Sequence, residues 1–285
     1  MDNKNLFLKI RNIRPSLNPA LKRIAEYILS NPKDVKHLRI KDLAKECGVA
    51  EATVTRFVRT IGFNSYQDFK ISIAELTTIR KEKKEFVYDE VSKDDNINNL
   101  SNKIIAINVK ALEDTHKILN IKEIKKAINA IDNADKIDIY GAGGSFIAAE
   151  NARMRFYRIG KRCMVYNDPN QEMVSASLLT NKDLAIGISN SGRTISTVNA
   201  LKLAKENGAK TICITNFDKT PLTEYADIKL FTSTCDSAFF QESMISRVAQ
   251  IVLIDILYAG LAVKNFDLSV KFIEKSAQAL THALL

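Results

Sequence analysis

The chain of 285 residues has no tryptophan and is poor in cysteine, histidine, proline and glycine. Its four cysteines are far apart, and with only three histidines they form no zinc-ligand spacing. We therefore expect buried thiols in a reducing cytoplasm, with no metal and no cofactor. No apolar run reaches about 18 residues, so no membrane-spanning helix is predicted. The first residues also lack a secretory signal pattern.

The net charge of +9 is unevenly distributed. Residues 1–85 contain 18 Lys and Arg against 10 Asp and Glu, whereas residues 86–285 contain 24 against 23. The positive surplus is therefore confined to the N-terminal third. A solvated surface could carry such a surplus, but its concentration favours a polyanionic partner for this part of the chain.

The N-terminal part has helical periodicity. Recurring apolar residues predict helices over residues 17–29, 40–47, 51–61 and 65–79. Ser65 is the expected N-cap of the last of these, with Asp68 three residues later as in a capping box. Residues 80–95 are dense in mixed charge, which is typical of a linker or an exposed helix extension. Two further helices are predicted near residues 97–119 and 121–131.

After residue 135, short apolar runs alternate with helical stretches. The runs predict strands over residues 137–140, 163–166, 184–188, 211–215 and 228–231. Helices are expected near residues 145–159, 170–180, 194–207, 220–226, 238–263 and 266–283. This rhythm indicates a doubly wound five-stranded parallel sheet with helices on both faces. We therefore predict an α/β protein with an all-α domain over 1–79, a linker over 80–95 and a sheet domain over 96–285.

The segment from Ile40 to Arg59 has the spacing of a helix-turn-helix. Ala44 is small where two helices cross, and Gly48 permits a tight left-handed turn between them. The predicted outward face of the second helix carries Thr53, Thr55, Arg56 and Arg59. These side chains suit phosphates and base edges in the major groove of double-stranded DNA. An ordinary helical hairpin has the same spacing, but the local positive charge favours DNA binding.

A second cluster of polar residues follows the apolar run at 184–188. Ser189, Ser191 and Thr194 supply hydroxyls, and the amides around Gly192 supply N–H donors. Ligands of doubly wound sheets bind beyond the carboxyl ends of the strands, where helix N-termini attract anions. The loop therefore predicts a site for a phosphate monoester. A Ser/Gly turn with a capped helix is the simpler alternative.

The loop after the first strand reads Gly-Ala-Gly-Gly-Ser over residues 141–145. Gly143 would let a ligand approach the backbone, and Ser145 is expected to cap the next helix and to offer its hydroxyl. Phe146 stands where a dinucleotide fingerprint needs glycine, so the pattern argues against NAD. We expect this loop to form the opposite wall of the phosphate site.

These motifs together resemble a known family. The stretches Leu21–Leu29, Ala52–Phe57 and Gly62–Lys70 resemble the RpiR family of bacterial transcriptional regulators. The Ser189–Thr194 loop resembles the phosphate loop of the sugar isomerase (SIS) domain that this family carries after its helix-turn-helix. Ala50 departs from the family, which usually has a capping serine there, at a cost of about 1 kcal/mol.

The resemblance implies further contacts and partners. It implies that Glu242, near the start of the last long helices, contacts sugar hydroxyls, although an acid at a helix N-terminus also has a purely structural use. It implies a homo-oligomer, a dimer or a tetramer, that presents two recognition helices to a pseudo-palindromic operator. We expect a regulator of carbohydrate metabolism that senses a phosphosugar effector.

An enzyme is the competing hypothesis. A phosphosugar aldose–ketose isomerase with an accessory helical domain would need a base near C1 and C2 of the sugar. Glu242 or Glu172 could serve, but none of the three histidines follows a predicted strand. We therefore predict no catalytic residue. A nucleoid-type protein with a vestigial pocket is a lesser alternative.

Overall fold

The computed structural model describes residues 6–14, 17–79, 95–233 and 244–280. The chain divides into two compact units, Met1–Asp89 and Glu90–Leu285. Most of the expected linker lies outside the described residues. The domain boundaries at residues 79 and 95 therefore stay a prediction.

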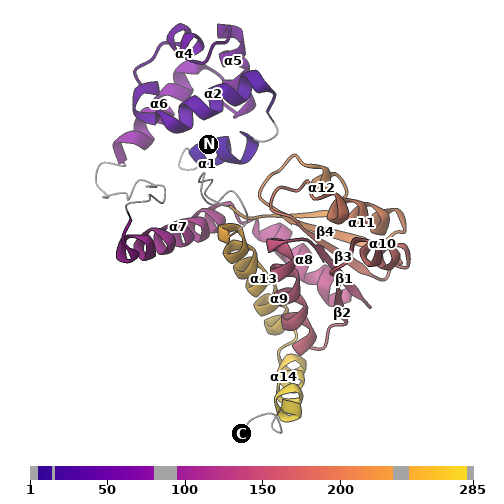
Figure 1. The fold of residues 1–285 in the computed structure, drawn as a ribbon. Coiled ribbons are helices and arrows are strands. Elements are labelled where there is room, and N and C mark those ends of the chain that lie inside the picture. Colours follow the sequence, from indigo (N-terminus) through magenta and orange to yellow (C-terminus); the bar gives the residue numbers. More distant parts are fainter. Residues whose placement is uncertain (1–5, 15–16, 80–94, 234–243, 281–285) are drawn as a thin grey trace. The chain divides into compact units, whose positions relative to one another are not determined.

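The N-terminal unit is helical (Figure 1). Its helices are α1 (Leu6–Ile13), α2 (Pro19–Ser30), α3 (Pro32–Val35), α4 (Ile40–Glu46), α5 (Glu51–Thr60) and α6 (Tyr66–Ile79). All four predicted helices are present, and the Ser65 hydroxyl accepts a hydrogen bond from the Asp68 N–H at 3.1 Å, which confirms the expected cap. Helix α3 was not predicted because Asn31 and Pro32 indicate the end of a helix. Proline is equally suited to a first helical turn, and here it begins α3.

The N-terminal helices share one apolar core. Ile24 and Ile28 of α2 lie in it with Leu43 of α4 and with Val54 and Phe57 of α5, all of them fully buried. Apolar side chains at helical spacing therefore bring α2, α4 and α5 together.

The C-terminal unit is an α/β domain, as predicted. Its strands are β1 (Ile137–Gly141), β2 (Cys163–Val165), β3 (Leu184–Ile188), β4 (Lys210–Thr215) and β5 (Ile228–Phe231). They form one parallel sheet in the order β2-β1-β3-β4-β5. The helices are α7 (Ile97–Ile118), α8 (Ile121–Asn133), α9 (Gly144–Arg158), α10 (Pro169–Ser177), α11 (Ile195–Glu206), α12 (Pro221–Glu224), α13 (Met244–Lys264) and α14 (Phe266–Leu280).

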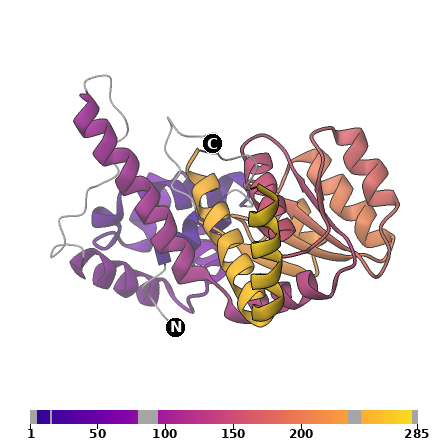
Figure 2. The same ribbon diagram turned by 90° about the horizontal axis from the view of Figure 1, so that it is seen from below.

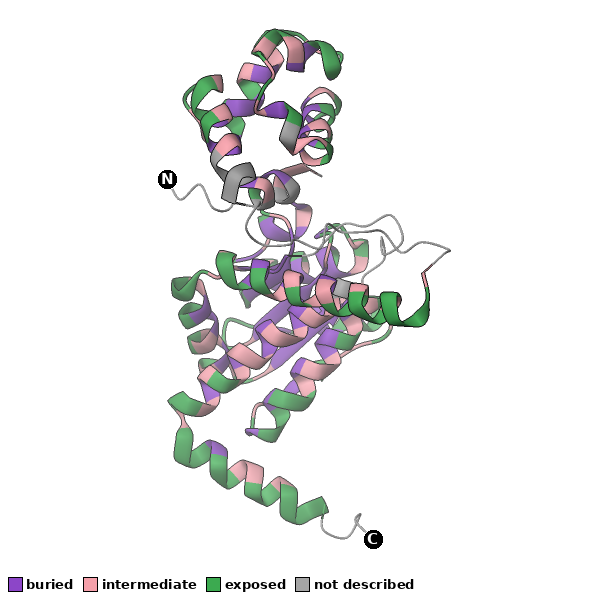
Figure 3. Cartoon of the chain, turned by 90° about the vertical axis from the view of Figure 1, so that its left-hand side faces the viewer, coloured by how far each residue is buried: buried purple, intermediate pink, exposed green. Residues whose placement is uncertain are grey.

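Helices cover both faces of this sheet (Figures 1 and 2). One core joins the sheet to α8, α9 and α13, and a second core joins it to α10, α11 and α12. Every residue of β1 and β3 is consequently buried, which explains the uninterrupted apolar sequence of β3. Figure 3 shows the buried strands in purple, whereas α14 is mostly exposed.

The strand order reverses between β1 and β3. The chain runs from β1 outward to β2 and then crosses back through α10 to β3, on the other side of β1. Gly141 at the end of β1 is the register partner of Ile188 at the end of β3. The loops after these two strands therefore begin side by side. In doubly wound sheets such a reversal opens the crevice in which ligands bind.

Candidate DNA-binding helix and ligand crevice

The turn between α4 and α5 has the predicted geometry. Gly48 has φ +60°, in the left-handed region, and the Val49 N–H donates to the Ala44 carbonyl at 2.9 Å. Ala44 is buried at the helix crossing. The small residue and the glycine therefore have the roles that the spacing indicated.

Helix α5 presents a basic outer face. Arg56 and Arg59 are exposed, while Thr53 and Thr55 are half-buried on the flanks of that face. The Thr55 hydroxyl donates to the Glu51 carbonyl at 3.2 Å, so this hydroxyl already has a partner within the helix. Ala50 is the N-cap and makes no side-chain hydrogen bond. Helix α5 thus begins without a side-chain cap.

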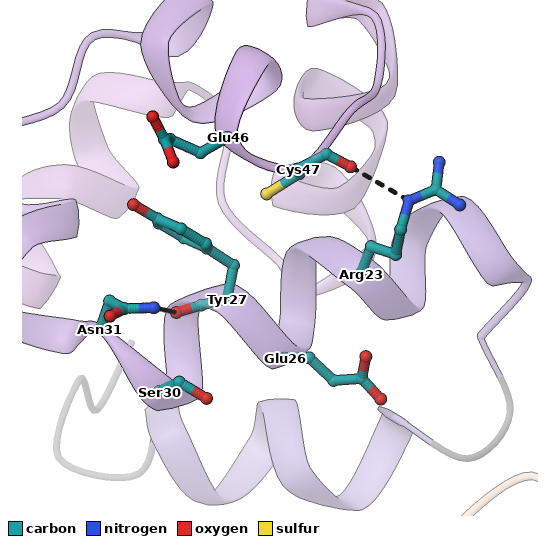
Figure 4. Close-up of a pocket in the computed structure, with 7 residues that line it drawn as sticks. All are labelled: Arg23, Glu26, Tyr27, Ser30, Asn31, Glu46 and Cys47. Atoms are coloured by element: carbon teal, nitrogen blue, oxygen red, sulfur yellow. Dashed lines mark hydrogen bonds between the residues drawn. The ribbon is translucent and has the colours of Figure 1, made fainter.

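Arg23 of α2 holds the turn from outside, a contact that the sequence did not reveal. Its Nε donates to the Cys47 carbonyl at 3.0 Å, and its terminal nitrogen donates to the Gly48 carbonyl at 3.1 Å. Figure 4 shows this guanidinium at the rim of a depression of about 310 Å³ between α2 and the end of α4. The two hydrogen bonds of this guanidinium connect the turn between α4 and α5 to α2.

The loop after β3 is held by its own hydroxyl groups. The Ser189 Oγ accepts from the Gly192 N–H at 3.1 Å and lies 2.9 Å from the Thr194 Oγ1. The Ser191 Oγ, which is exposed, accepts from the Arg193 N–H at 3.3 Å. Thr194 is the N-cap of α11, whose first N–H groups have no partner within the helix. The loop therefore presents a compact turn directly at a helix N-terminus.

The loop after β1 corrects one prediction. Ser145 does not cap α9, because Gly143 is the N-cap and the helix already includes Gly144. The positive φ of Gly143, +57°, lets the helix begin earlier than the sequence indicated. Ser145 is instead buried, and its hydroxyl accepts a hydrogen bond from the Gln250 Nε2 of α13 at 3.3 Å. A Cβ at Gly143 would meet nothing within 4 Å, so this backbone stays open to a ligand.

Of the two glutamates that the sequence indicated, the structure describes one. Glu242 lies outside the described residues. Glu172, which the sequence indicated only as a possible base, is buried in the first turn of α10. Nothing in the sequence marks it as buried, since an acid in a first helical turn is common on exposed helices.

Three of the cysteines are buried free thiols, as expected. They are Cys47, Cys163 and Cys213, and Cys235 lies outside the described residues. Burial raises the pKa of the Cys47 thiol to about 11. Among the residues that the structure describes, no helix is long and apolar enough to cross a membrane.

The two units define the class of protein: a helix-turn-helix and a five-stranded SIS-type α/β domain on one chain. The helix-turn-helix domain of the rpiR family matches residues 4–82, and the SIS domain matches residues 130–260. A protein of Caldanaerobacter subterraneus subsp. tengcongensis, named an uncharacterised HTH-type transcriptional regulator, is 38% identical over 272 residues and is matched over 95% of both chains. The chain belongs to the RpiR family of helix-turn-helix transcriptional regulators.

Two solved structures have the same fold. The NanR protein of Vibrio vulnificus, complexed with ManNAc-6P, matches with a TM-score of 0.63 at 24% identity, over 98% of this chain and 99% of that chain. The sugar isomerase domain of an RpiR transcription factor from Sphaerobacter thermophilus matches with a TM-score of 0.59 at 24% identity, over 63% of this chain and 98% of that chain. The predicted fold class is thereby confirmed.

Proposed function

We propose that this transcriptional regulator binds operator DNA through α5 and controls that binding with a phosphosugar held in the crevice between β1 and β3. The proposal is carried by the presence of two parts on one chain. The loops after β1 and β3 meet at the reversal of the strand order, and one of them ends at the N-terminus of α11. On the same chain, a basic helix follows a tight turn. A ligand site and a DNA-reading helix on one chain are the two parts that an effector-controlled regulator needs.

The DNA contacts proposed for α5 are of two kinds. Arg56 and Arg59 would reach bases or phosphates of the DNA from the exposed face of α5. Thr53 and Thr55 would contact the DNA backbone or a thymine methyl from the flanks of that face. The concentration of positive charge in residues 1–85 supports this assignment, because phosphate neutralisation dominates the affinity for DNA.

The effector contacts proposed for the crevice combine two loops. Ser189, Ser191, Gly192 and Thr194 would hold the phosphate at the N-terminus of α11, with Gly143 and Ser145 on the opposite wall. Glu242 is proposed from the family resemblance alone. The complex of Vibrio vulnificus NanR with ManNAc-6P supports the choice of ligand class. The effector would act through its different affinity for the DNA-competent and DNA-incompetent arrangements.

We also propose that the chain acts as a homo-oligomer and not as an enzyme. The large apolar side chains Phe266, Leu268 and Leu280 are exposed on α14, and such exposure supports a contact between copies. Light scattering of the purified chain tests this point, and a monomer would contradict it. Sustained turnover of any sugar phosphate by the purified chain would instead support the isomerase alternative.

The DNA half of the proposal is tested on duplexes that the purified full chain selects from a random library. Arg56→Ala should weaken binding and lower the salt slope by about one. Arg158→Ala, an exposed arginine of the other unit, is the control because it removes the same charge. If Arg56→Ala binds the selected duplex with unchanged affinity and salt slope, the assignment of α5 is wrong.

The effector half is tested with a panel of hexose, amino-sugar and pentose phosphates. The phosphosugar that raises the melting temperature most should also change the affinity for the selected duplex. The Ser189→Ala, Ser191→Ala double variant should lose both effects. Ser177→Ala, which removes an exposed hydroxyl at the end of α10, should keep them. A full response from the double variant would exclude this loop as the phosphate site.

A further inference from the structure

Glu172 is a buried acid at the reversal of the strand order. It belongs to the first turn of α10, the helix that crosses back from β2 to β3, and its side chain is only 3% exposed. Burial raises the pKa of its carboxyl group, and hydrogen bonds from the Ser196 hydroxyl and the Gly141 backbone N–H oppose that rise. Gly141 ends β1, and Ser196 lies in the first turn of α11. The carboxyl group therefore lies between the two elements that carry the crevice loops.

One oxygen of this carboxyl group has no hydrogen-bond partner in the part of the chain that the structure describes. The Glu172 Oε2 is buried and makes no hydrogen bond with any residue that the structure describes. A buried carboxyl oxygen in that state is unfavourable by about 1–3 kcal/mol or more. Its charged neighbour Asp168 is another acid, which raises the pKa of the Glu172 carboxyl further. What the atom lacks is a hydrogen-bond donor.

Helix capping does not explain the position of Glu172. The N-terminus of α10 is already capped by Asp168, whose Oδ1 accepts from the Asn170 N–H at 2.8 Å and from the Gln171 N–H at 3.0 Å. An acid that favours the helix dipole also works from an exposed position and gains nothing from burial. The burial of Glu172 beside the end of β1 therefore calls for another use.

We propose that Glu172 determines the choice of sugar, by accepting a hydrogen bond from a hydroxyl group of the phosphosugar on its free carboxyl oxygen. This inference rests on the proposed function, in which the Ser189–Thr194 loop holds the phosphate. The phosphate loop and the Glu172 carboxyl group would recognise different parts of the ligand. The phosphate loop recognises what all phosphosugars share, and a buried acceptor rejects a sugar that lacks the matching donor because the acceptor is then left unpaired.

The direct test is Glu172→Gln in the full chain. The amide keeps one oxygen that can accept hydrogen bonds from Gly141 and Ser196, but it replaces the second oxygen with a donor, which mismatches a sugar hydroxyl. Affinities are measured by calorimetry for inorganic phosphate, for the phosphosugar that the unaltered chain binds best, and for its deoxy analogues. We expect unchanged affinity for inorganic phosphate and at least about tenfold weaker binding of the phosphosugar. The preference over one deoxy analogue should disappear.

Two further variants keep the test interpretable. Gln171→Ala changes the exposed neighbour on α10 and should leave all affinities unchanged. Ser196→Ala removes one hydrogen bond to the carboxyl group but keeps the free oxygen, so it should retain the preference for the hydroxylated sugar. If an amino sugar is preferred and its amine carries the preference, the proposed hydroxyl is wrong.

The outcomes separate this inference from the proposed function. If the unaltered chain binds no phosphosugar, the proposed function fails and this inference fails with it. If it binds a phosphosugar and Glu172→Gln changes neither affinity nor preference while the variant stays folded, only the role of Glu172 is overturned. Loss of inorganic phosphate binding in a folded Glu172→Gln variant would also overturn it, because the residue would then serve the phosphate.

Discussion

Gly192 and Thr220 are packed so closely that a Cβ on Gly192 would lie 2.3 Å from the Thr220 Oγ1. The same glycine has φ +64°, and its carbonyl accepts from the Leu222 N–H at 3.1 Å. Thr220 is the N-cap of α12, in the connection between β4 and β5. The proposed phosphate loop is therefore shaped by its neighbour in the fold as well as by its own sequence.

The first prediction concerns this packing. Gly192→Ala should destabilise the chain by more than about 1 kcal/mol, because it adds a steric clash to a left-handed backbone. Gly208→Ala is the matched control. Gly208 has φ +88°, but its Cβ would come no closer than 3.8 Å to the nearest atom. Denaturant unfolding measures both variants, and equal losses would show that the contact with Thr220 has no energetic weight.

The second prediction concerns the missing cap of α5. Ala50 has φ −75° and ψ 152°, the extended conformation of an N-cap. Ala50→Ser should therefore stabilise the N-terminal unit by about 1 kcal/mol and raise its melting temperature. Ala52→Ser places the same side chain inside the exposed face of the helix and should not stabilise it. A gain from Ala52→Ser as large as that from Ala50→Ser would argue against capping.

The third prediction concerns the contact of Arg23 with the turn. Arg23→Met keeps much of the apolar stem but leaves the Cys47 and Gly48 carbonyls without the guanidinium. It should destabilise the N-terminal unit by about 1 kcal/mol and weaken DNA binding through a looser turn. Lys22→Met removes an equal charge from the neighbouring exposed position and should affect stability little. Equal effects on stability from both variants would contradict a specific role of Arg23.

The fourth prediction concerns acid stability. Partial burial by itself raises the pKa of the Asp132 carboxyl, but hydrogen bonds from Lys161, Lys264 and Asn265 outweigh it and hold the pKa below its ordinary value of 3.8. A lowered pKa means that this contribution is fully present above pH 3.8 and is lost as the pH falls through the folded-state pKa. Asp132→Asn should therefore cost about 1 kcal/mol at pH 7 and progressively less below pH 4.

Unfolding curves between pH 2.5 and 7 measure this dependence. Glu206→Gln is the control, because Glu206 and Lys202 form an exposed ion pair at 3.8 Å that should contribute little. A constant difference between Asp132→Asn and the unaltered chain over the whole pH range would contradict an ionic contribution.

The local sequence predicted the helices and strands better than the connections between them. The strand β3 was predicted with the bounds Leu184 and Ile188, because a continuous apolar run is distinctive when both faces of a sheet are covered. Gly48 was predicted because a tight turn at that spacing requires its backbone. Ser145 was misassigned as a cap, because the conformation of Gly143 depends on how β1 enters α9 and not on the serine.

The candidate site was harder to predict from the sequence than the helices and strands, because several of its contacts depend on the tertiary fold. The Ser189–Thr194 loop was recognisable because its chemistry is contained in six consecutive residues. The contacts of Arg23 with the turn join residues 24 and 25 positions apart. The burial of Glu172 depends on α10 crossing back over β1. Contacts between residues so far apart produce no periodic pattern in the sequence from which they could be predicted.

The sequence by itself determined the two-part organisation, the helix-turn-helix and the parallel sheet. Apolar periodicity, charge and short motifs predict each of these features, because each depends on residues that are close together in the sequence. Tertiary structure alone decided that Thr220 constrains Gly192, and that one oxygen of Glu172 is buried without a hydrogen-bond donor among the described residues. The reason is physical: burial and close contact depend on the order in which strands pair, and parallel pairing joins segments that are distant in the sequence.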